Sequence, residues 1–146
     1  MTSLIFPDLN VWLSLSLRAH SHHARAWSWY QSLRGEEELA FCRMTQLGLL
    51  RLLTTEKAAG KETQTQAGAW AVYDGWVKKG GATYLEEPFG IETEFRFYAQ
   101  RPTPSPKEWG DSYLVAFAAA ASLPLVTFDQ GLSQRYARSI LLKTVV

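Results

Sequence analysis

Short apolar runs alternate along this chain with longer stretches of helical periodicity, and this alternation constrains the fold more than any other feature. Strand-like runs occupy residues 4–6, 39–41, 82–85, 125–128 and 140–142. Between them, apolar side chains recur three and four residues apart, as on one face of a helix. The helices expected from this spacing cover residues 9–17, 22–33, 45–55, 70–80, 89–100 and 114–121. Strands that alternate with helices form a parallel sheet covered on both faces, so we expect an α/β fold.

Length and composition set the outer limits. The chain has 146 residues, of which 47% are hydrophobic and 20% charged, so we expect a single globular domain spanning 1–146. The net charge of +1 excludes a strong global field, and any nucleic-acid site has to be a local patch. The only cysteine, Cys42, excludes disulfide frameworks and favours a reducing compartment. No apolar run reaches the roughly 20 residues of a membrane span, so a cytoplasmic protein is expected.

Three aspartates stand where a parallel sheet would place a functional crevice. Asp8 follows the first strand, Asp129 follows the strand at 125–128, and Asp111 lies on the core-facing side of the helix behind a proline-rich loop at 101–106. In parallel sheets, ligands bind beyond the carboxyl ends of the strands. Carboxylates gathered there repel one another, and a divalent cation relieves this repulsion. Oxygen-only ligands favour Mg²⁺ or Mn²⁺ over Zn²⁺.

Each aspartate also has a purely structural interpretation. Asp8 could be the N-cap of the helix that follows it, and Asp129 with Gly131 could form a turn. Asp111 could complement the dipole of its own helix. Position alone leaves both interpretations open for each residue.

Four ordered segments resemble the PIN domain, and most closely the VapC-type ribonuclease toxins of bacterial toxin–antitoxin pairs. They are Phe6-Pro7-Asp8-Leu9-Asn10-Val11-Trp12-Leu13, Thr45-Gln46-Leu47-Gly48-Leu49-Leu50-Arg51, Trp109-Gly110-Asp111-Ser112-Tyr113-Leu114-Val115-Ala116 and Val126-Thr127-Phe128-Asp129. The resemblance implies a three-layer α/β/α fold with a central parallel sheet. It also implies metal-dependent cleavage of RNA, in which Asp8, Asp111 and Asp129 are the catalytic residues and the ligands of Mg²⁺ or Mn²⁺. Asn10 and Thr127 match polar residues that orient these carboxylates.

Gln46 departs from the family pattern, which has a further acid, typically glutamate, at this place. A neutral amide can still offer an oxygen to an ion or hold a water, but the site loses one negative charge. Gln46 therefore motivates an alternative function, a catalytically weak PIN-like module that binds RNA or protein. A phosphotransfer receiver or a haloacid-dehalogenase-like phosphatase is a third possibility, which is weakened because Asn10 stands where a second aspartate would be expected.

The resemblance further implies an RNA substrate, a cognate antitoxin protein and a homodimer. We expect an apolar groove along the helix bearing Val11, Trp12 and Leu15, with a basic side chain of the antitoxin reaching Asp8 or Asp111. Most of the six tryptophans are expected in the core. The histidines at 20, 22 and 23 are interpreted as a polar helix start rather than a metal site. The candidate RNA-phosphate contacts are Arg18, Arg25, Arg43, Arg51 and Lys107.

Overall fold

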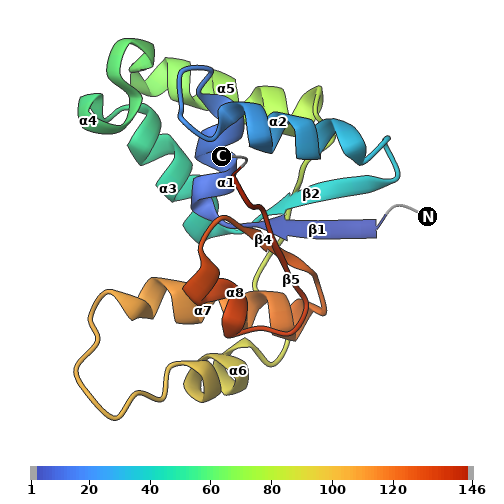
Figure 1. Ribbon diagram of the computed structural model, residues 1–146, viewed down its shortest axis with the longest axis vertical. Coiled ribbons are helices and arrows are strands. Elements are labelled where there is room, and N and C mark those ends of the chain that lie inside the picture. Colours follow the sequence, from blue (N-terminus) through green and yellow to red (C-terminus); the bar gives the residue numbers. More distant parts are fainter. Residues whose placement is uncertain (1–2, 145–146) are drawn as a thin grey trace.

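The computed structural model describes residues 3–144, which form a five-stranded parallel sheet (Figure 1). The strand order is β3-β2-β1-β4-β5, so the first strand lies at the centre. The bounds are β1 Ser3–Pro7, β2 Glu37–Phe41, β3 Thr83–Tyr84, β4 Leu125–Thr127 and β5 Ser139–Leu141. The predicted parallel sheet is confirmed.

Helices cover both faces of this sheet. The helical segments are α1 Leu9–Ser16, α2 His23–Ser32, α3 Arg43–Leu53, α4 Glu56–Ala59, the 3₁₀ turn η1 Gly60–Glu62, α5 Gln66–Lys78, α6 Ile91–Tyr98, α7 Glu108–Ala121 and α8 Gln130–Gln134. In Figure 1, α1 to α5 lie above the sheet, and α6, α7 and α8 lie below it. This arrangement is the three-layer α/β/α fold that the resemblance implied.

Each face of the sheet carries its own apolar cluster, because neighbouring side chains of a strand point to opposite faces. Above the sheet, Trp12 of α1 stacks on Phe41 of β2 with ring centroids 3.7 Å apart. Below it, Phe6 of β1 stacks on Phe117 of α7 at 4.9 Å. Apolar clusters therefore pack against β1 from both faces of the sheet. This packing fixes the position of the chain segment that follows β1 at the edge of the sheet.

Several local predictions are wrong. The apolar spacing in residues 45–55 and 70–80 predicts that Leu47 and Trp70 face the core, but these side chains are 62% and 47% exposed. Of the six tryptophans, Trp12 and Trp29 are the only buried ones among the described residues. The sequence analysis also missed α4, η1 and α8, which are too short for their periodicity to show.

Within residues 3–144, no helix has the length and apolarity needed to cross a membrane.

Candidate functional site at the acidic edge of the sheet

Pairing of the two central strands brings Asp8 next to Thr127. Phe6 lies opposite Leu125 and Pro7 opposite Val126, so both strands end at the same edge. The Thr127 hydroxyl donates to Asp8 Oδ2, and the backbone N–H of Val11 donates to Asp8 Oδ1 at 3.1 Å. Asp8 is thus the N-cap of α1, as its structural interpretation predicted, and it also receives a bond from across the sheet. An N-cap uses only one carboxylate oxygen, so the hydrogen bond from Thr127 to the second oxygen is not part of the cap.

Asp129 and Asp111 approach the same edge from two further segments. Asp129 follows β4 and caps α8, with Oδ1 accepting from the Leu132 N–H at 3.1 Å. Its own N–H donates to Thr127 Oγ1 at 2.9 Å, which ties it to Asp8 through one hydroxyl. Asp111 lies in the first turn of α7. Asp8 is buried, Asp111 is half-buried and Asp129 is exposed, so the carboxylates span the distance from core to solvent. We call Asp8, Asp111 and Asp129 the acidic edge.

The charges of the acidic edge act on one another. Burial raises the pKa of Asp8 from 3.8 to about 6, the two hydrogen bonds oppose this rise, and the Asp111 and Asp129 charges add to it. Burial and then the Asp129 charge raise the pKa of Asp111, which Arg135 partly counteracts. Arg135 donates to Ser112 Oγ at 2.7 Å and to the Tyr98 carbonyl at 2.8 Å. It therefore fixes the start of α7 without pairing directly with an aspartate.

None of the three aspartates forms an ion pair in the described part of the chain, although the Arg135 charge acts on Asp111 from a distance. The ion pairs found there, Arg96–Glu92 and Arg101–Glu108, lie elsewhere. Asp8 is only 5% exposed, and a buried carboxylate without a cation is costly. At the same time, residues 3–144 contain no group of three His, Cys, Asp or Glu side chains arranged to hold an ion. The three aspartates therefore interact through their charges without forming a closed set of ligands.

The first two turns of α3 bridge the two ends of the acidic edge. A Cβ built on Gly48 would lie 2.7 Å from Leu9 Cδ2, directly after Asp8, and one on Gly110 would lie 2.8 Å from Met44 Cε, directly before Asp111. Gln46 lies between these two contacts and is buried. Glycine at both positions thus allows α3 to approach the starts of α1 and α7 closely.

The Gln46 side chain is engaged by an arginine. Its Oε1 accepts a hydrogen bond of 2.6 Å from Arg43 Nη1, and the Arg43 guanidinium lies 4.8 Å from the centre of the Tyr84 ring. The sequence analysis named Arg43 without separating it from four other basic residues. Its position three residues before Gln46, on the same helix face, is the signal that would have singled it out.

Two other expectations about the site fare differently. Thr127 lies beside Asp8, as expected. Asn10 is exposed, and its side chain makes no hydrogen bond to Asp8 in the described residues, so Thr127 and the Val11 N–H orient that carboxylate.

The groove expected along α1 and opening onto the carboxylates is not found in residues 3–144, because Val11, Trp12 and Leu15 are 0–4% exposed and belong to the core. Leu15 borders only a different hollow, at the end of α1. One hollow of about 630 Å³ lies instead between α3 and α7 beside the acidic edge, and we call it the α3–α7 hollow. Its lining includes Arg43, Met44, Trp109 and Gly110.

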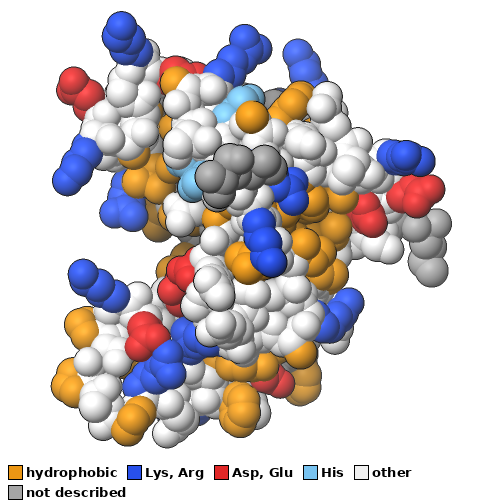
Figure 2. All heavy atoms as spheres, in the orientation of Figure 1, with side chains coloured by type: hydrophobic (Ala, Val, Ile, Leu, Met, Phe, Trp, Pro, Cys, Tyr) orange, Lys and Arg blue, Asp and Glu red, His pale blue; other side chains and the backbone are white. Residues whose placement is uncertain are grey.

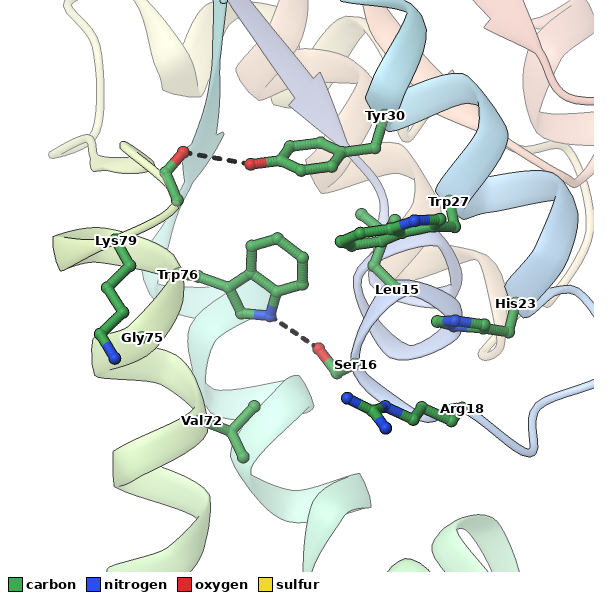
Figure 3. A pocket seen from close by; sticks show the side chains of 11 residues that line it. Leu15, Ser16, Arg18, His23, Trp27, Tyr30, Val72, Gly75, Trp76 and Lys79 are labelled. Carbon is green, nitrogen blue, oxygen red and sulfur yellow. Dashed lines mark hydrogen bonds between the residues drawn. The ribbon is translucent and has the colours of Figure 1, made fainter.

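A second hollow, of about 620 Å³, lies between α2 and α5 and has aromatic walls. Figure 3 shows Trp27, Tyr30 and Trp76 around it, with Arg18 and Lys79 on its rim. The polar groups of two of these aromatic residues are satisfied internally, since Trp76 Nε1 donates to Ser16 Oγ at 2.9 Å and the Tyr30 hydroxyl to the Gly80 carbonyl at 3.3 Å. We call it the aromatic hollow.

Comparisons with known proteins agree with this architecture. The PIN domain family model matches residues 5–138. The chain is 38% identical over 139 residues to Ribonuclease VapC41 of Mycobacterium tuberculosis, a match that covers 90% of this chain and 92% of that protein.

Solved structures show the same fold at low sequence identity. VapBC2 from Rickettsia felis, bound to a DNA fragment from their promoter, aligns with a TM-score of 0.67 at 11% identity over 94% of this chain and 96% of that one. The sarcin-ricin loop cleaving toxin VapC20 of Mycobacterium tuberculosis aligns with a TM-score of 0.60 at 13% identity over 89% and 93%. FitAcB from Neisseria gonorrhoeae aligns with a TM-score of 0.52 at 23% identity over 94% and 96%.

Proposed function

Because the chain belongs to the PIN domain family, we propose that it is an endoribonuclease and the toxin of a type II toxin–antitoxin pair. The 38% identity to a ribonuclease over nine-tenths of the chain supports the activity. The observation that carries the proposal is the acidic edge, where a buried carboxylate has no cation beside it. No observation favours the alternative that Gln46 suggested, a catalytically weak module that binds RNA or protein.

The donor chemistry of the acidic edge suits a hard divalent cation, although its three carboxylates would have to move closer together to hold one. Its donors are carboxylate oxygens, and the raised pKa of Asp8 reflects a site that disfavours its own negative charge. We propose that Asp8, Asp111 and Asp129 hold Mg²⁺ or Mn²⁺. Such an ion supplies an activated water near neutral pH and stabilises charge on a phosphodiester.

The chain's own residues prepare the edge for this chemistry. Thr127 donates to Asp8 and accepts from the Asp129 N–H, so a single hydroxyl fixes two of the three aspartates relative to each other. Asp8 is held in one orientation because both of its oxygens accept hydrogen bonds. Asp111 and Asp129 lack this double restraint among the described residues and can shift toward an ion at lower cost.

We propose an antitoxin as protein partner, and two solved neighbours are described as VapBC and FitAcB assemblies. A basic side chain of that partner would reach Asp8 or Asp111 and supply the cation that the edge lacks. Co-expression with the neighbouring open reading frame should then restore growth that the chain alone suppresses. Equal growth with and without this neighbour, with soluble protein in both cases, contradicts the toxin role.

A homodimer remains a prediction from the family resemblance, and sedimentation velocity of the purified chain tests it. The nuclease activity is tested by incubating the purified chain with RNA in Mg²⁺ or in EDTA. Cleavage in Mg²⁺ alone is expected. Asp74→Asn, which changes a carboxylate of α5 outside the acidic edge, is the matched control and should cleave as the wild type does.

A further inference from the structure

Arg43 is a basic side chain of the α3–α7 hollow, whereas the cationic charge that acts on Asp111 is that of Arg135. We propose that Arg43 binds a phosphate of the RNA there and so positions the strand for cleavage, an inference that rests on the proposed ribonuclease function. Arg43 is exposed at the start of α3 and lines the α3–α7 hollow together with Gly110, which directly precedes Asp111. A phosphate bound by Arg43 would therefore lie at the margin of the aspartates.

Two contacts prepare Arg43 for this role. Gln46 Oε1 accepts from one guanidinium nitrogen at 2.6 Å, and the Tyr84 ring lies under the guanidinium plane at 4.8 Å. The other guanidinium N–H groups make no hydrogen bond within residues 3–144. Arginine binds phosphate through just such a planar fork, and fixing the fork in advance lowers the entropy lost on binding.

Three other candidate phosphate contacts, Arg18, Arg25 and Arg51, are placed less favourably, whereas Lys107 directly precedes α7. Arg18 lines the aromatic hollow, and the Arg25 side chain donates to the Lys143 carbonyl at 2.9 Å. Arg51 lies in the last turn of α3, two turns beyond Arg43. Lysine and arginine side chains are scattered over the face seen in Figure 2, where no continuous basic patch gathers. On this face, affinity for RNA would have to come from individual cations.

This proposal gives the amide at position 46 a physical meaning. A glutamate there would form an ion pair with Arg43 and cancel the charge that a phosphate seeks. Glutamine keeps the guanidinium in place through one neutral acceptor and leaves its charge available. The loss of one carboxylate from the family pattern thereby becomes a gain for substrate binding.

The test measures RNA binding without cleavage. Asp8→Asn protein in EDTA is titrated with a short fluorescein-labelled single-stranded RNA at several salt concentrations. One lost phosphate contact should lower the slope of log K against log salt by about 0.7. We expect this change for Arg43→Gln, whereas Arg51→Gln, the matched control on the same helix, should keep the wild-type slope.

Two further variants examine how Arg43 is held. Gln46→Glu should lower the slope as Arg43→Gln does, because an ion pair occupies the guanidinium. Tyr84→Leu should weaken binding, whereas Tyr84→Phe, which keeps the ring, should not. Equal slopes for Arg43→Gln and Arg51→Gln, or a Gln46→Glu protein that binds RNA more tightly, overturn the proposal.

The same experiment separates this inference from the proposed function. If wild-type protein cleaves no RNA in Mg²⁺ but Arg43→Gln still lowers the slope, the nuclease role fails and the phosphate contact stands. If wild-type protein cleaves RNA while Arg43→Gln leaves the slope unchanged, the phosphate contact fails and the nuclease role stands.

Discussion

The acidic edge and the aromatic hollow differ in whether neighbouring residues compensate their polar and charged groups. In the aromatic hollow, Trp76 and Tyr30 both find internal hydrogen-bond partners, so nothing polar in these two side chains is left for a ligand to satisfy. In the acidic edge, Asp8 accepts two hydrogen bonds, yet its buried negative charge stays without a cation among the described residues. Hydrogen bonds satisfy the lone pairs of a carboxylate but do not neutralise it.

This difference predicts which substitutions change the stability of the protein and which change its function. Polar groups with internal hydrogen-bond partners and packed aromatic rings lower the free energy of the folded state. A buried charge raises this free energy, and such a charge is expected where it serves a reaction. Changes in the aromatic hollow should therefore cost stability and spare cleavage. Changes in the acidic edge should abolish cleavage and cost little stability or none.

The largest expected effect is on cleavage. Asp8→Asn and Asp111→Asn should each lower the rate of RNA cleavage by more than about 100-fold, since even residues that merely support metal ligands are worth roughly 10–100-fold. Both variants should keep the wild-type circular dichroism spectrum. A folded Asp8→Asn protein that cleaves within a few-fold of wild type would remove Asp8 from the site.

The next effect falls on the aromatic hollow. Trp76 packs edge-on against Trp12 and Tyr30 at 5.6 and 5.5 Å. Trp76→Ala should lower the free energy of unfolding by about 2–3 kcal/mol, somewhat below the range for fully buried tryptophan because Trp76 is half-buried. Urea titration measures this loss. Cleavage per folded molecule should stay at the wild-type level, and a selective loss of activity would break the distinction between the two regions.

A smaller effect is expected from restoring the family's acid. Gln46→Glu adds a negative charge beside the acidic edge and should tighten Mn²⁺ binding by about tenfold, which is about 1.4 kcal/mol. Calorimetric titration of the isolated protein measures the affinity, with Gln64→Glu in the loop between η1 and α5 as the charge-matched control. Equal affinities of the wild-type and Gln46→Glu proteins would show that position 46 lies outside the ion's reach.

The smallest effect concerns one hydrogen bond of the aromatic hollow. Ser16→Ala removes the acceptor of Trp76 Nε1 and should cost about 1 kcal/mol of unfolding free energy. Thermal unfolding followed by tryptophan fluorescence measures the shift. A larger loss than that of Trp76→Ala would mean that packing contributes less to this region than its one polar contact.

The sequence predicted the order of the main strands and helices because their apolar spacing is set by burial on both faces of the sheet. The placement of Asp8, Thr127 and Asp129 at one edge followed from the parallel topology, which brings the ends of β1 and β4 together. The exposed fraction of helical side chains was harder to predict. An apolar stripe on a helix does not show how much of that stripe the neighbouring elements cover. Leu47 lies on such a stripe and is still 62% exposed.

The hydrogen bonds and charge interactions around the site could not be predicted from the sequence, for a similar reason. The engagement of Gln46 by Arg43 depends on rotamers and on Tyr84, which comes from a different strand. The prediction of a groove along α1 was wrong because the apolar side chains Val11, Trp12 and Leu15 pack into the core. Apolar spacing alone cannot tell an enclosed helix from one that lines a groove.

The central claim is that the acidic edge stores an uncompensated charge which a cation relieves. Because the pKa of Asp8 rises from 3.8 to about 6 on folding, its ionisation costs nothing below pH 4 and about 2–3 kcal/mol above pH 6. Asn is uncharged and can still accept the Val11 N–H through its Oδ1, while its Nδ2 would donate to Thr127 Oγ1, so that bond reverses direction. The decisive measurement is the unfolding free energy of wild type and Asp8→Asn at pH 7.5, in EDTA and in saturating Mn²⁺. We predict that Asp8→Asn is the more stable protein in EDTA and that Mn²⁺ closes or reverses the gap by stabilising the wild type alone. A wild type that is already the more stable in EDTA, or a gap that Mn²⁺ leaves unchanged, would contradict the account.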